Sequence, residues 1–260
     1  MDRRTIDLNA DVGEATDPEG IAREESLLTL VTSANVACGG HAGDDWSMRR
    51  TVRRALAQGV RIGAHPSYPD RQGFGRRPVA MDRSALHSAL VEQLVALARV
   101  CEGLGSAIES VKPHGALYGE AGNGGTVYEA VRDAVRQVCG EAVPLVLASG
   151  CPALAAARRD GVTVRQEGFC DRAYGRHGEL VPRGEPGAVL TGAAQAAEQA
   201  LRLVRGDVVT DGSTVALWVD TLCIHGDSPD ALALATAVRA KLAEAHVGVT
   251  APSDDDLETR

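Results

Sequence analysis

The sequence is poor in aromatic residues and has no long apolar run. Aromatic residues make up 3% of the 260 residues, so a folded core must be built mainly from aliphatic side chains. Hydrophobic residues reach 44% and charged residues 24%, which is typical of a globular domain and excludes disorder, collagen and coiled coil. Because no stretch approaches the ~20 consecutive apolar residues of a membrane helix, we expect no membrane partner.

Basic residues and closely spaced cysteines are also scarce. Lysine and arginine total 27 against 35 acidic residues, and the resulting net charge of −8 predicts that nucleic acid is not a partner. No apolar signal-peptide core follows the first five residues, so we expect a cytoplasmic protein. The six cysteines form no C-x-x-C pair, which argues against structural zinc and a disulfide framework. We interpret them as buried thiols, with Cys38 beside the 39–41 segment left open.

Three catalytic or nucleotide-binding signatures are missing. The sequence contains neither G-x-x-x-x-G-K-[ST] nor a G-x-G-x-x-G that follows a strand, so we recognise no nucleotide site of its own. It also lacks the G-x-S-x-G nucleophile elbow, which leaves serine acyl transfer without support. The glycine-rich segment 39–43 could hold an anion on its amides, but a tight turn explains the glycines equally well.

What the sequence does contain is an alternation of short apolar runs with longer helical patterns. This alternation is the signature of repeated βα units around a parallel sheet. Periodicity alone does not choose between a doubly wound sheet and a (β/α) barrel with fewer than eight strands. We expect one domain over residues 1–250 and a flexible acidic tail over 251–260. The predicted strands are Thr5–Asp11, Ser33–Cys38, Arg61–His65, Ser110–His114, Pro144–Ala148, Val162–Cys170 and Val215–His225, the last long enough for a bend or two short strands.

Local signals mark where several helices begin. Asp82 is a predicted N-cap, and Thr126 with Glu129 forms a predicted capping box. Residues 228–229 predict the start of the final helix.

Polar side chains collect where the predicted strands end. Four of the seven histidines lie there, which chance burial would not produce. In parallel α/β folds these strand ends converge on one face, where ligands bind. The residues concerned are Asn9, Asp11, His41, His65, Lys112, His114, Glu167, Asp171, Arg172, His225 and Asp227.

Acidic residues near the ends of the first two predicted strands have simpler structural explanations beside the functional one. Asp11 could form a turn before Gly13, and Asp44 or Asp45 could be the N-cap of the next helix. Lys112 is different, because a lysine in an apolar strand needs an anionic partner or substrate.

Together, the strand-end segments resemble the LamB/YcsF family. The resemblance runs from about residue 5 to about residue 250, with the motifs in the family's order. The family pattern has a bulky aromatic where Gly40 stands and alanine where Cys170 stands, so these departures bear on the pocket rim and the substrate fit. The matching segments are 6–14 (IDLNADVGE), 33–44 (SANVACGGHAGD), 62–66 (IGAHP), 73–77 (GFGRR), 112–118 (KPHGALY), 167–172 (EGFCDR) and 223–227 (CIHGD).

The resemblance implies a fold and an activity. The implied fold is an incomplete TIM-like (β/α) barrel of about seven parallel strands. The implied activity is the hydrolysis of 5-oxo-L-proline to L-glutamate, coupled to ATP hydrolysis, by a complex with two other 5-oxoprolinase subunits, of the B and C type. ATP would be bound mainly through those partners, which would phosphorylate the lactam oxygen before this chain promotes ring opening.

Roles for individual residues follow from the resemblance and from the chemistry of amide hydrolysis. Asp11 or His41 is expected to act as base, His65 and His114 to transfer protons or orient groups, and Lys112 to supply a cation. This makes the expected catalytic set Asp11, His41, His65, Lys112 and His114. The expected substrate-binding set is Asn9, Asn35, Glu167, Arg172 and His225, in which Arg172 is a second cation and Asn9 and His225 orient neighbouring groups.

Two rival functions stay open at this stage. Asp11, His41, His65 and His114 offer the ligand types of a divalent metal site, as in metal-dependent carbohydrate deacetylases on related barrels. Alternatively, the chain is a ligand-binding subunit without catalysis of its own.

Overall fold

Seven parallel strands close into a barrel in the computed structural model, which describes residues 5–190, 192–210, 212–226, 228 and 230–251. Neighbouring strands pair in parallel register, and β1 closes the barrel by pairing with both β2 and β9. The predicted TIM-like barrel of about seven parallel strands is confirmed. Its strands are β1 (Thr5–Val12), β2 (Ser33–Ala37), β3 (Arg61–His65), β4 (Ser110–Val111), β5 (Leu145–Ala148), β6 (Val164–Phe169) and β9 (Thr221–Ile224).

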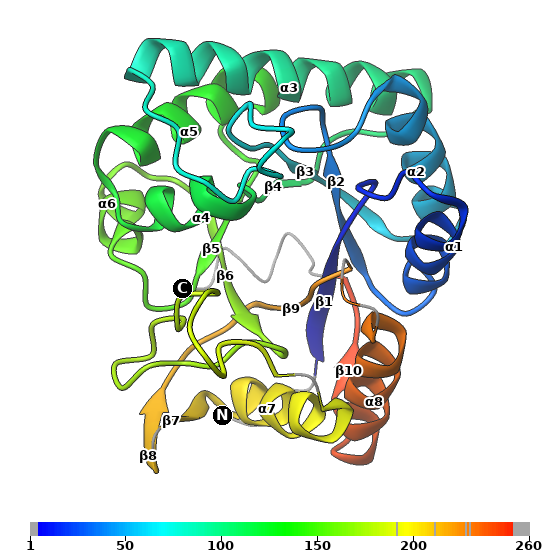
Figure 1. Ribbon diagram of the computed structural model, residues 1–260, viewed down its shortest axis with the longest axis vertical. Coiled ribbons are helices and arrows are strands. Elements are labelled where there is room, and N and C mark those ends of the chain that lie inside the picture. Colours follow the sequence, from blue (N-terminus) through cyan, green and yellow to red (C-terminus); the bar gives the residue numbers. More distant parts are fainter. Residues whose placement is uncertain (1–4, 191, 211, 227, 229, 252–260) are drawn as a thin grey trace.

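Helices surround this barrel and cover its outer face (Figure 1). In α3 the buried side chains Leu86, Leu90, Leu94 and Leu97 recur every three or four residues, so one face of the helix is apolar and packs inward. Longer helices also pack in pairs, α3 against α5 and α7 against α8. The described helices are α1 (Pro18–Leu27), α2 (Asp45–Ala57), α3 (Arg83–Gly103), α4 (Gly115–Gly122), α5 (Gly125–Cys139), α6 (Ala153–Arg159), α7 (Ala193–Arg205) and α8 (Ala231–Glu244).

The helix starts agree with the sequence in part. Asp82 caps α3 by accepting a hydrogen bond from the amide of Ala85, and Asp44 caps α2 in a reciprocal capping box with Ser47. The capping box predicted for Thr126 and Glu129 is wrong. Helix α5 already begins at Gly125, after a glycine with a positive φ of 86°, so Thr126 lies inside the first turn and no side chain caps the helix.

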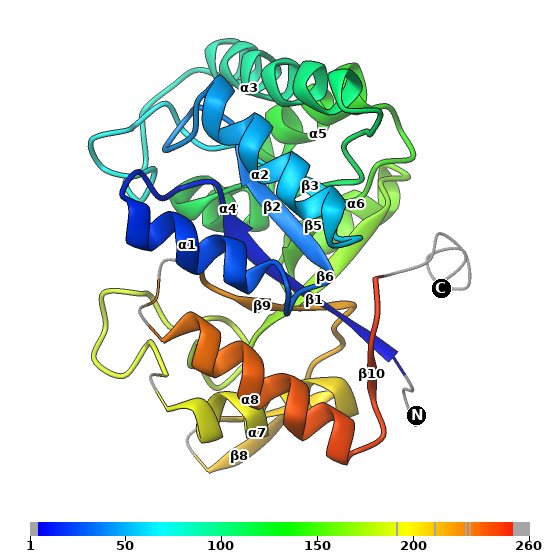
Figure 2. The ribbon, with the colours of Figure 1, turned by 90° about the vertical axis from the view of Figure 1, so that its right-hand side faces the viewer.

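Three short strands complete the structure. The predicted strand Val215–His225 divides into the end of β8 (Ser213–Ala216) and the barrel strand β9. Strand β8 pairs with β7 (Asp207–Thr210) in an antiparallel hairpin that the sequence analysis did not predict. Strand β10 (Gly248–Val249) pairs with the start of β1, at the opposite end of the barrel from the connections that follow β3 and β6 (Figure 2).

Some expectations fall outside the described residues. These are the tail beyond residue 251, Asp227 and the helix-start signal at Pro229. Helix α8 begins at Ala231, and its side chains Leu234, Val238 and Leu242 are buried. Among the described helices, none combines the length and the apolar composition needed to cross a membrane.

Candidate active site

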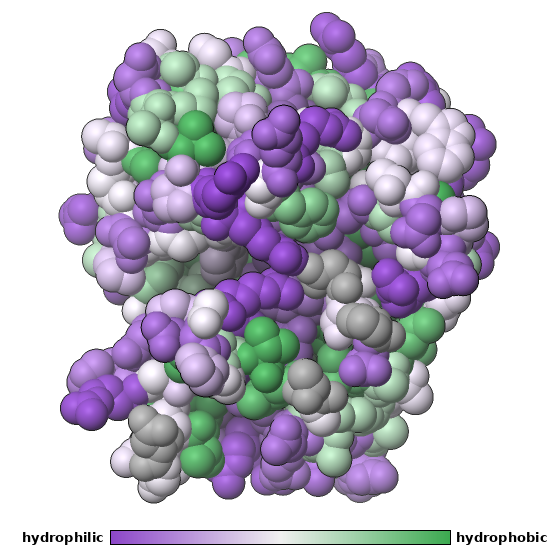
Figure 3. Space-filling model, in the orientation of Figure 1, coloured by the Kyte–Doolittle hydropathy of each residue, from purple (hydrophilic) through white to green (hydrophobic). Residues whose placement is uncertain are grey.

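A cavity of about 320 Å³ lies at the carboxyl ends of the barrel strands. Asp11, Lys112, His114 and His225 line it from strand ends of the barrel, and so does His65. Hydrophilic side chains gather over the middle of this face of the molecule (Figure 3). The expected convergence of strand-end polar residues is therefore present, and the cavity is where they meet.

Lys112 is the central cation of the cavity floor. Its Nζ lies 3.0 Å from Asp11 Oδ1 and 2.9 Å from Glu167 Oε1, and it donates to Cys223 Sγ at 3.2 Å. All four side chains are buried. Burial opposes the charged form of Lys112, but Asp11, Cys223 and Glu167 hold the pKa of its ammonium well above the usual value. The anionic partner that the sequence analysis required for this lysine is a pair of carboxylates from β1 and β6.

Asp11 is ionised by the same arrangement. Burial opposes its charge, but His65 and Lys112 hold the pKa of the carboxyl well below its usual range. Asn35 also donates to Asp11 Oδ1 at 2.9 Å. The result is a buried carboxylate that is charged at neutral pH and borders the cavity.

Three of the residues expected to bind substrate lie beneath the cavity rather than on its wall. Asn9 donates to Glu167 Oε1 at 3.0 Å and to Thr221 Oγ1 at 2.7 Å, while Asn35 donates to Asn9 Oδ1 at 2.8 Å. Glu167 is 1% exposed and accepts a hydrogen bond of 2.8 Å from Tyr118. Asn9, Asn35 and Glu167 form a buried polar layer that fixes Asp11 and Lys112 in place.

Three histidine rings meet beside the Asp11 carboxylate. His65 Nε2 lies 2.9 Å from His114 Nδ1 and 3.4 Å from Asp11 Oδ2, and His41 stacks on His114 with ring centroids 3.6 Å apart. The backbone allows this approach at two glycines, Gly75 and Gly115, which both have positive φ; a Cβ on Gly115 would lie 2.5 Å from the carbonyl oxygen of Gly75.

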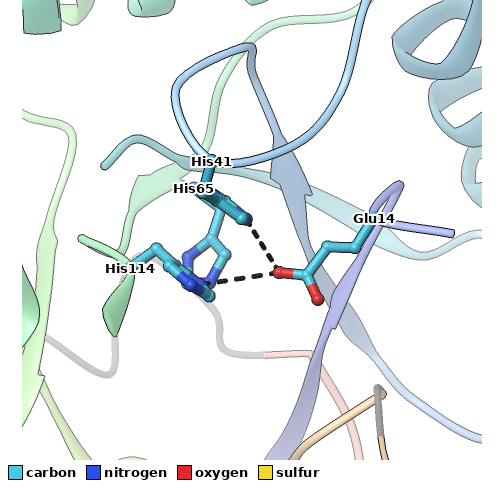
Figure 4. Close-up of side chains that lie close together, drawn as sticks. All are labelled: Glu14, His41, His65 and His114. Carbon is cyan, nitrogen blue, oxygen red and sulfur yellow. Dashed lines mark hydrogen bonds and ion pairs between the residues drawn. The ribbon is translucent and has the colours of Figure 1, made fainter. Parts of the chain in front are cut away.

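Glu14 is a member of this cluster that sequence reasoning missed. Its Oε1 lies 2.8 Å from His41 Nε2 and 3.5 Å from His114 Nδ1 (Figure 4). Glu14 does not end a strand; it follows Gly13, whose positive φ of 78° turns the chain back toward the histidines. The signal available in the sequence was the Asp-x-Gly-Glu spacing after β1. His41 does not line the cavity, and burial together with His65 lowers its pKa to about 2.

His225, which also lines the cavity, forms a separate ion pair with Asp171. Its Nδ1 lies 2.9 Å from Asp171 Oδ2, and its backbone amide donates to the same oxygen at 3.2 Å. Burial opposes the charge of the ring, but Asp171 raises the pKa of His225 above the ordinary 6.5. Despite its own burial, Asp171 has a lowered pKa because of His225. The cavity thus has an imidazolium on one wall and a carboxylate on another.

Asp171→Asn is expected to lower the pKa of His225 from above 6.5 to below it, because burial then acts unopposed by the carboxylate. The ion pair stabilises the fold at pH values between the pKa of Asp171 in the unfolded chain and the pKa of His225 in the unfolded chain. The contribution of His225 is lost as the pH rises through the pKa of this ring in the folded chain. The stability difference between wild type and variant should therefore be largest between pH 3.8 and 6.5. NMR titration of the His225 ring and urea unfolding across pH measure both effects. An unchanged ring titration would contradict the assignment.

Arg172 lies at the mouth of the cavity, as expected for a substrate cation. Its Nε donates to the carbonyl of Ala188 at 3.2 Å and its Nη2 to that of Val181 at 2.6 Å, which fixes the guanidinium in the wall. Arg76 and Arg183 also line the cavity, so it has a cationic rim. Leu180 and Pro182 supply an apolar part of the wall that sequence periodicity did not indicate.

The comparisons with known proteins cover nearly the whole chain. The model of the LamB/YcsF family matches residues 6–256. The chain belongs to the LamB/YcsF family. It is 47% identical over 250 residues to the 5-oxoprolinase A subunit of Methylococcus capsulatus, covering 95% of this chain and 96% of the relative. It is 46% identical to the protein of the same name from Bordetella pertussis, covering 95% and 98%.

Solved structures extend the comparison from the sequence to the fold. A lactam utilization protein from Thermus thermophilus superposes with a TM-score of 0.87 at 40% identity, covering 95% of this chain and all of that one. A family 4 carbohydrate esterase from Streptomyces lividans reaches a TM-score of 0.50 at 11% identity, with 97% and 95% coverage. At that identity the likeness to the esterase concerns the fold alone.

Gly40 and Cys170, which depart from the LamB/YcsF pattern, do not line the cavity, whereas Gly119, where the pattern often has asparagine, does. A Cβ on Gly40 would lie 2.4 Å from Gln93 Oε1 and from Ser67 Oγ, so the side chains of these two neighbours fill the space beside the glycine. Cys170 is buried, and burial raises the pKa of its thiol well above the usual value. Cys38, which was left open, is also buried, and its pKa of about 12 keeps it a neutral thiol.

Proposed function

We propose that this chain is the A subunit of an ATP-dependent 5-oxoprolinase and opens the lactam ring of 5-oxo-L-proline to give L-glutamate. The observation that carries the proposal is the near-full-length identity of 46–47% with relatives of that name. The site supports it independently. A cavity of about 320 Å³ suits a small ligand, and its arginines suit the carboxylate of 5-oxoproline or a phosphate on the lactam oxygen.

The reaction needs activation before hydrolysis. A five-membered lactam is a resonance-stabilised amide, and phosphorylation of its oxygen by ATP makes the carbonyl carbon a better electrophile. Water then adds to that carbon, and the C–N bond breaks as the ring nitrogen takes a proton, which gives γ-glutamyl phosphate. A second water hydrolyses this acyl phosphate and releases phosphate and the γ-carboxylate of glutamate. Because this chain has no recognised nucleotide motif, we assign ATP binding to two partner subunits of the B and C type.

Asp11 is the proposed base for water attack. We choose Asp11 over His41, the other candidate that the sequence left open, because Asp11 lines the cavity and His41 does not. The carboxylate is held in place by Lys112 at 3.0 Å and by Asn35 at 2.9 Å. Fixed, desolvated and charged, it can accept a proton from a water molecule in the cavity. Lys112 also offers positive charge to an oxyanion that develops beside it.

His225 is the proposed acid for the departing nitrogen. The sequence analysis gave it only an orienting role, but the ion pair with Asp171 keeps the ring protonated at a higher pH than a free histidine. Asp11 and His225 come from the ends of β1 and β9, which pair directly, so base and acid line neighbouring parts of one cavity. A base that stays ionised and an acid that stays protonated meet the two proton transfers of ring opening.

Glutamate release from 5-oxoproline and ATP tests the proposed function. We expect release when this chain and its partner subunits are mixed, and none from either preparation alone. His177→Ala, which removes an exposed histidine outside the cavity, serves as the matched control and should keep full activity. Release by the partners alone at the rate of the mixture, or an inactive mixture of folded subunits, would contradict the proposal.

A further inference from the structure

The tautomers of two cavity histidines are fixed by backbone carbonyls. His65 Nδ1 lies 2.7 Å from the carbonyl oxygen of Lys112, and His114 Nε2 lies 2.9 Å from that of Phe74. A carbonyl oxygen only accepts hydrogen bonds, so each of these ring nitrogens must carry the proton. In a neutral ring the other nitrogen then carries a lone pair, which leaves His65 Nε2 and His114 Nδ1 as acceptors.

Those two acceptors face each other. His65 Nε2 and His114 Nδ1 are 2.9 Å apart, a hydrogen-bond distance with no proton between them when both rings are neutral. Two carboxylate oxygens, Glu14 Oε1 at 3.5 Å from His114 Nδ1 and Asp11 Oδ2 at 3.4 Å from His65 Nε2, add further lone pairs. Buried acceptors this close repel one another unless a cation lies among them.

His41 completes the group. Its Nε2 lies 2.8 Å from Glu14 Oε1, and one ligand atom from each of Glu14, His41, His65 and His114 lies within 4.8 Å of all the others. Without a metal, His41 Nε2 carries a proton that it donates to Glu14 Oε1, and an ion bound there would replace that proton; His41 Nδ1 is buried without a hydrogen-bond partner among the described residues. Tetrahedral zinc with bonds of about 2.0–2.1 Å would separate its ligand atoms by about 3.3 Å. Three of the six separations, at 2.8, 2.9 and 3.5 Å, lie near that value, and all six are within 4.8 Å. The rings of His41 and His114 stack in parallel planes, so one of them must turn for both nitrogens to face the same ion.

We propose that Glu14, His41, His65 and His114 bind one divalent transition-metal ion of the zinc class. Imidazole nitrogens suit Zn²⁺, Co²⁺ and Ni²⁺, whereas Mg²⁺ and Ca²⁺ take oxygen ligands. The carbonyls of Lys112 and Phe74 are the outer partners that hold two of the ligand rings in the required tautomer. Burial lowers the pKa values of His41 and His114, which favours the neutral rings that a metal needs.

This assignment differs from the ligand set suggested by the sequence. There Asp11 stood among the candidate ligands, but its Oδ1 is engaged by Lys112 and Asn35, while Glu14 Oε1 contacts two of the histidines. A cation held there would lie behind the cavity wall formed by His65 and His114, next to the proposed base. The inference stands on ligand geometry and does not depend on the proposed reaction.

Metal binding can be measured without any activity assay. The untagged chain, stripped with a chelator and titrated with Zn²⁺, is expected to bind close to one ion per chain by calorimetry and by elemental analysis after desalting. Glu14→Gln and His114→Gln should each weaken binding by more than the ~10–100-fold that loss of an outer-shell partner costs. His177→Gln is the matched control and should bind as the wild type does.

A second candidate group makes the experiment selective. Asp11, Cys223 and His225 also offer ligand atoms within 4.8 Å of one another. Cys223→Ser should leave Zn²⁺ affinity unchanged, and Co²⁺ bound to the wild type should show visible ligand-field bands without thiolate charge transfer. The proposal is overturned if the folded, metal-free chain binds neither ion, in which case a shared proton joins the two rings. It is also overturned if Cys223→Ser abolishes binding while Glu14→Gln retains it.

Discussion

Asp11→Asn is expected to lower kcat for glutamate release by the assembled complex by roughly 10²–10⁴-fold, the usual contribution of a positioned general base. Asparagine has nearly the same shape as aspartate but cannot take a proton from water at neutral pH. Its amide can still occupy the space between Lys112 and Asn35, and Lys112 keeps the partner Glu167 at 2.9 Å. Since Asp11 is proposed to act in the chemical step, kcat should fall far more than KM changes.

The matched control is Asp45→Asn, which removes a carboxylate that is 71% exposed on α2. It should leave kcat within experimental error. Complex formation and far-ultraviolet circular dichroism, measured for both variants, separate a catalytic loss from a failure to fold or assemble. If Asp11→Asn folds, assembles and turns over at the wild-type rate, the carboxylate is not the base.

The βα units were predictable because their strands and helices bury repeated aliphatic patterns, whereas closure into a barrel was implied by the family resemblance. Each βα unit carries its own local signal, and the polar residues that end the strands must share one face of any parallel α/β fold. That rule accounts for the position of the cavity and for four of the residues that line it, Asp11, Lys112, His114 and His225. The hairpin β7–β8 was not predictable, because each of its strands has only four residues and β8 buries none of its side chains, which is too little alternation to be distinguished from a loop.

Other features depend on contacts between distant segments. Glu14 reaches the histidines because Gly13 turns the chain after β1. The arginine-rich rim combines Arg76 from the segment after β3 with Arg172 and Arg183 from the segment after β6. The position of a residue at a strand end likewise does not show whether its side chain lines the cavity or belongs to the buried polar layer beneath it. Asn9 and Glu167 point into a network of buried polar groups, and only the register of β1 and of β6 against β9 shows this.

Lys112→Met is expected to destabilise the chain by about 3–5 kcal/mol at neutral pH, the usual cost of removing one partner from a buried ion pair. Methionine fills much of the volume of the lysine side chain but leaves Asp11 and Glu167, both buried, without their shared cation. The backbone carbonyl that fixes His65 is retained, so the histidine cluster should keep its geometry. Urea unfolding followed by circular dichroism measures the loss.

The size of that loss should depend on pH and on Glu167 in a defined way. The lowered pKa of Asp11 contributes stability above its unfolded pKa of 3.8 that is lost as pH falls through the folded pKa. The difference in the free energy of unfolding between wild type and Lys112→Met should therefore become smaller toward acidic pH, where protonated carboxyls no longer need the ammonium. Adding Glu167→Gln to Lys112→Met should recover part of the stability, because only Asp11 then lacks the cation. Gln can still accept from Asn9 through its carbonyl oxygen, while its amide NH2 can donate to the Tyr118 hydroxyl oxygen. Additive losses in the double variant would mean that Lys112 and Glu167 act independently, and the shared-cation arrangement would then fail as an account of how the cavity floor is held.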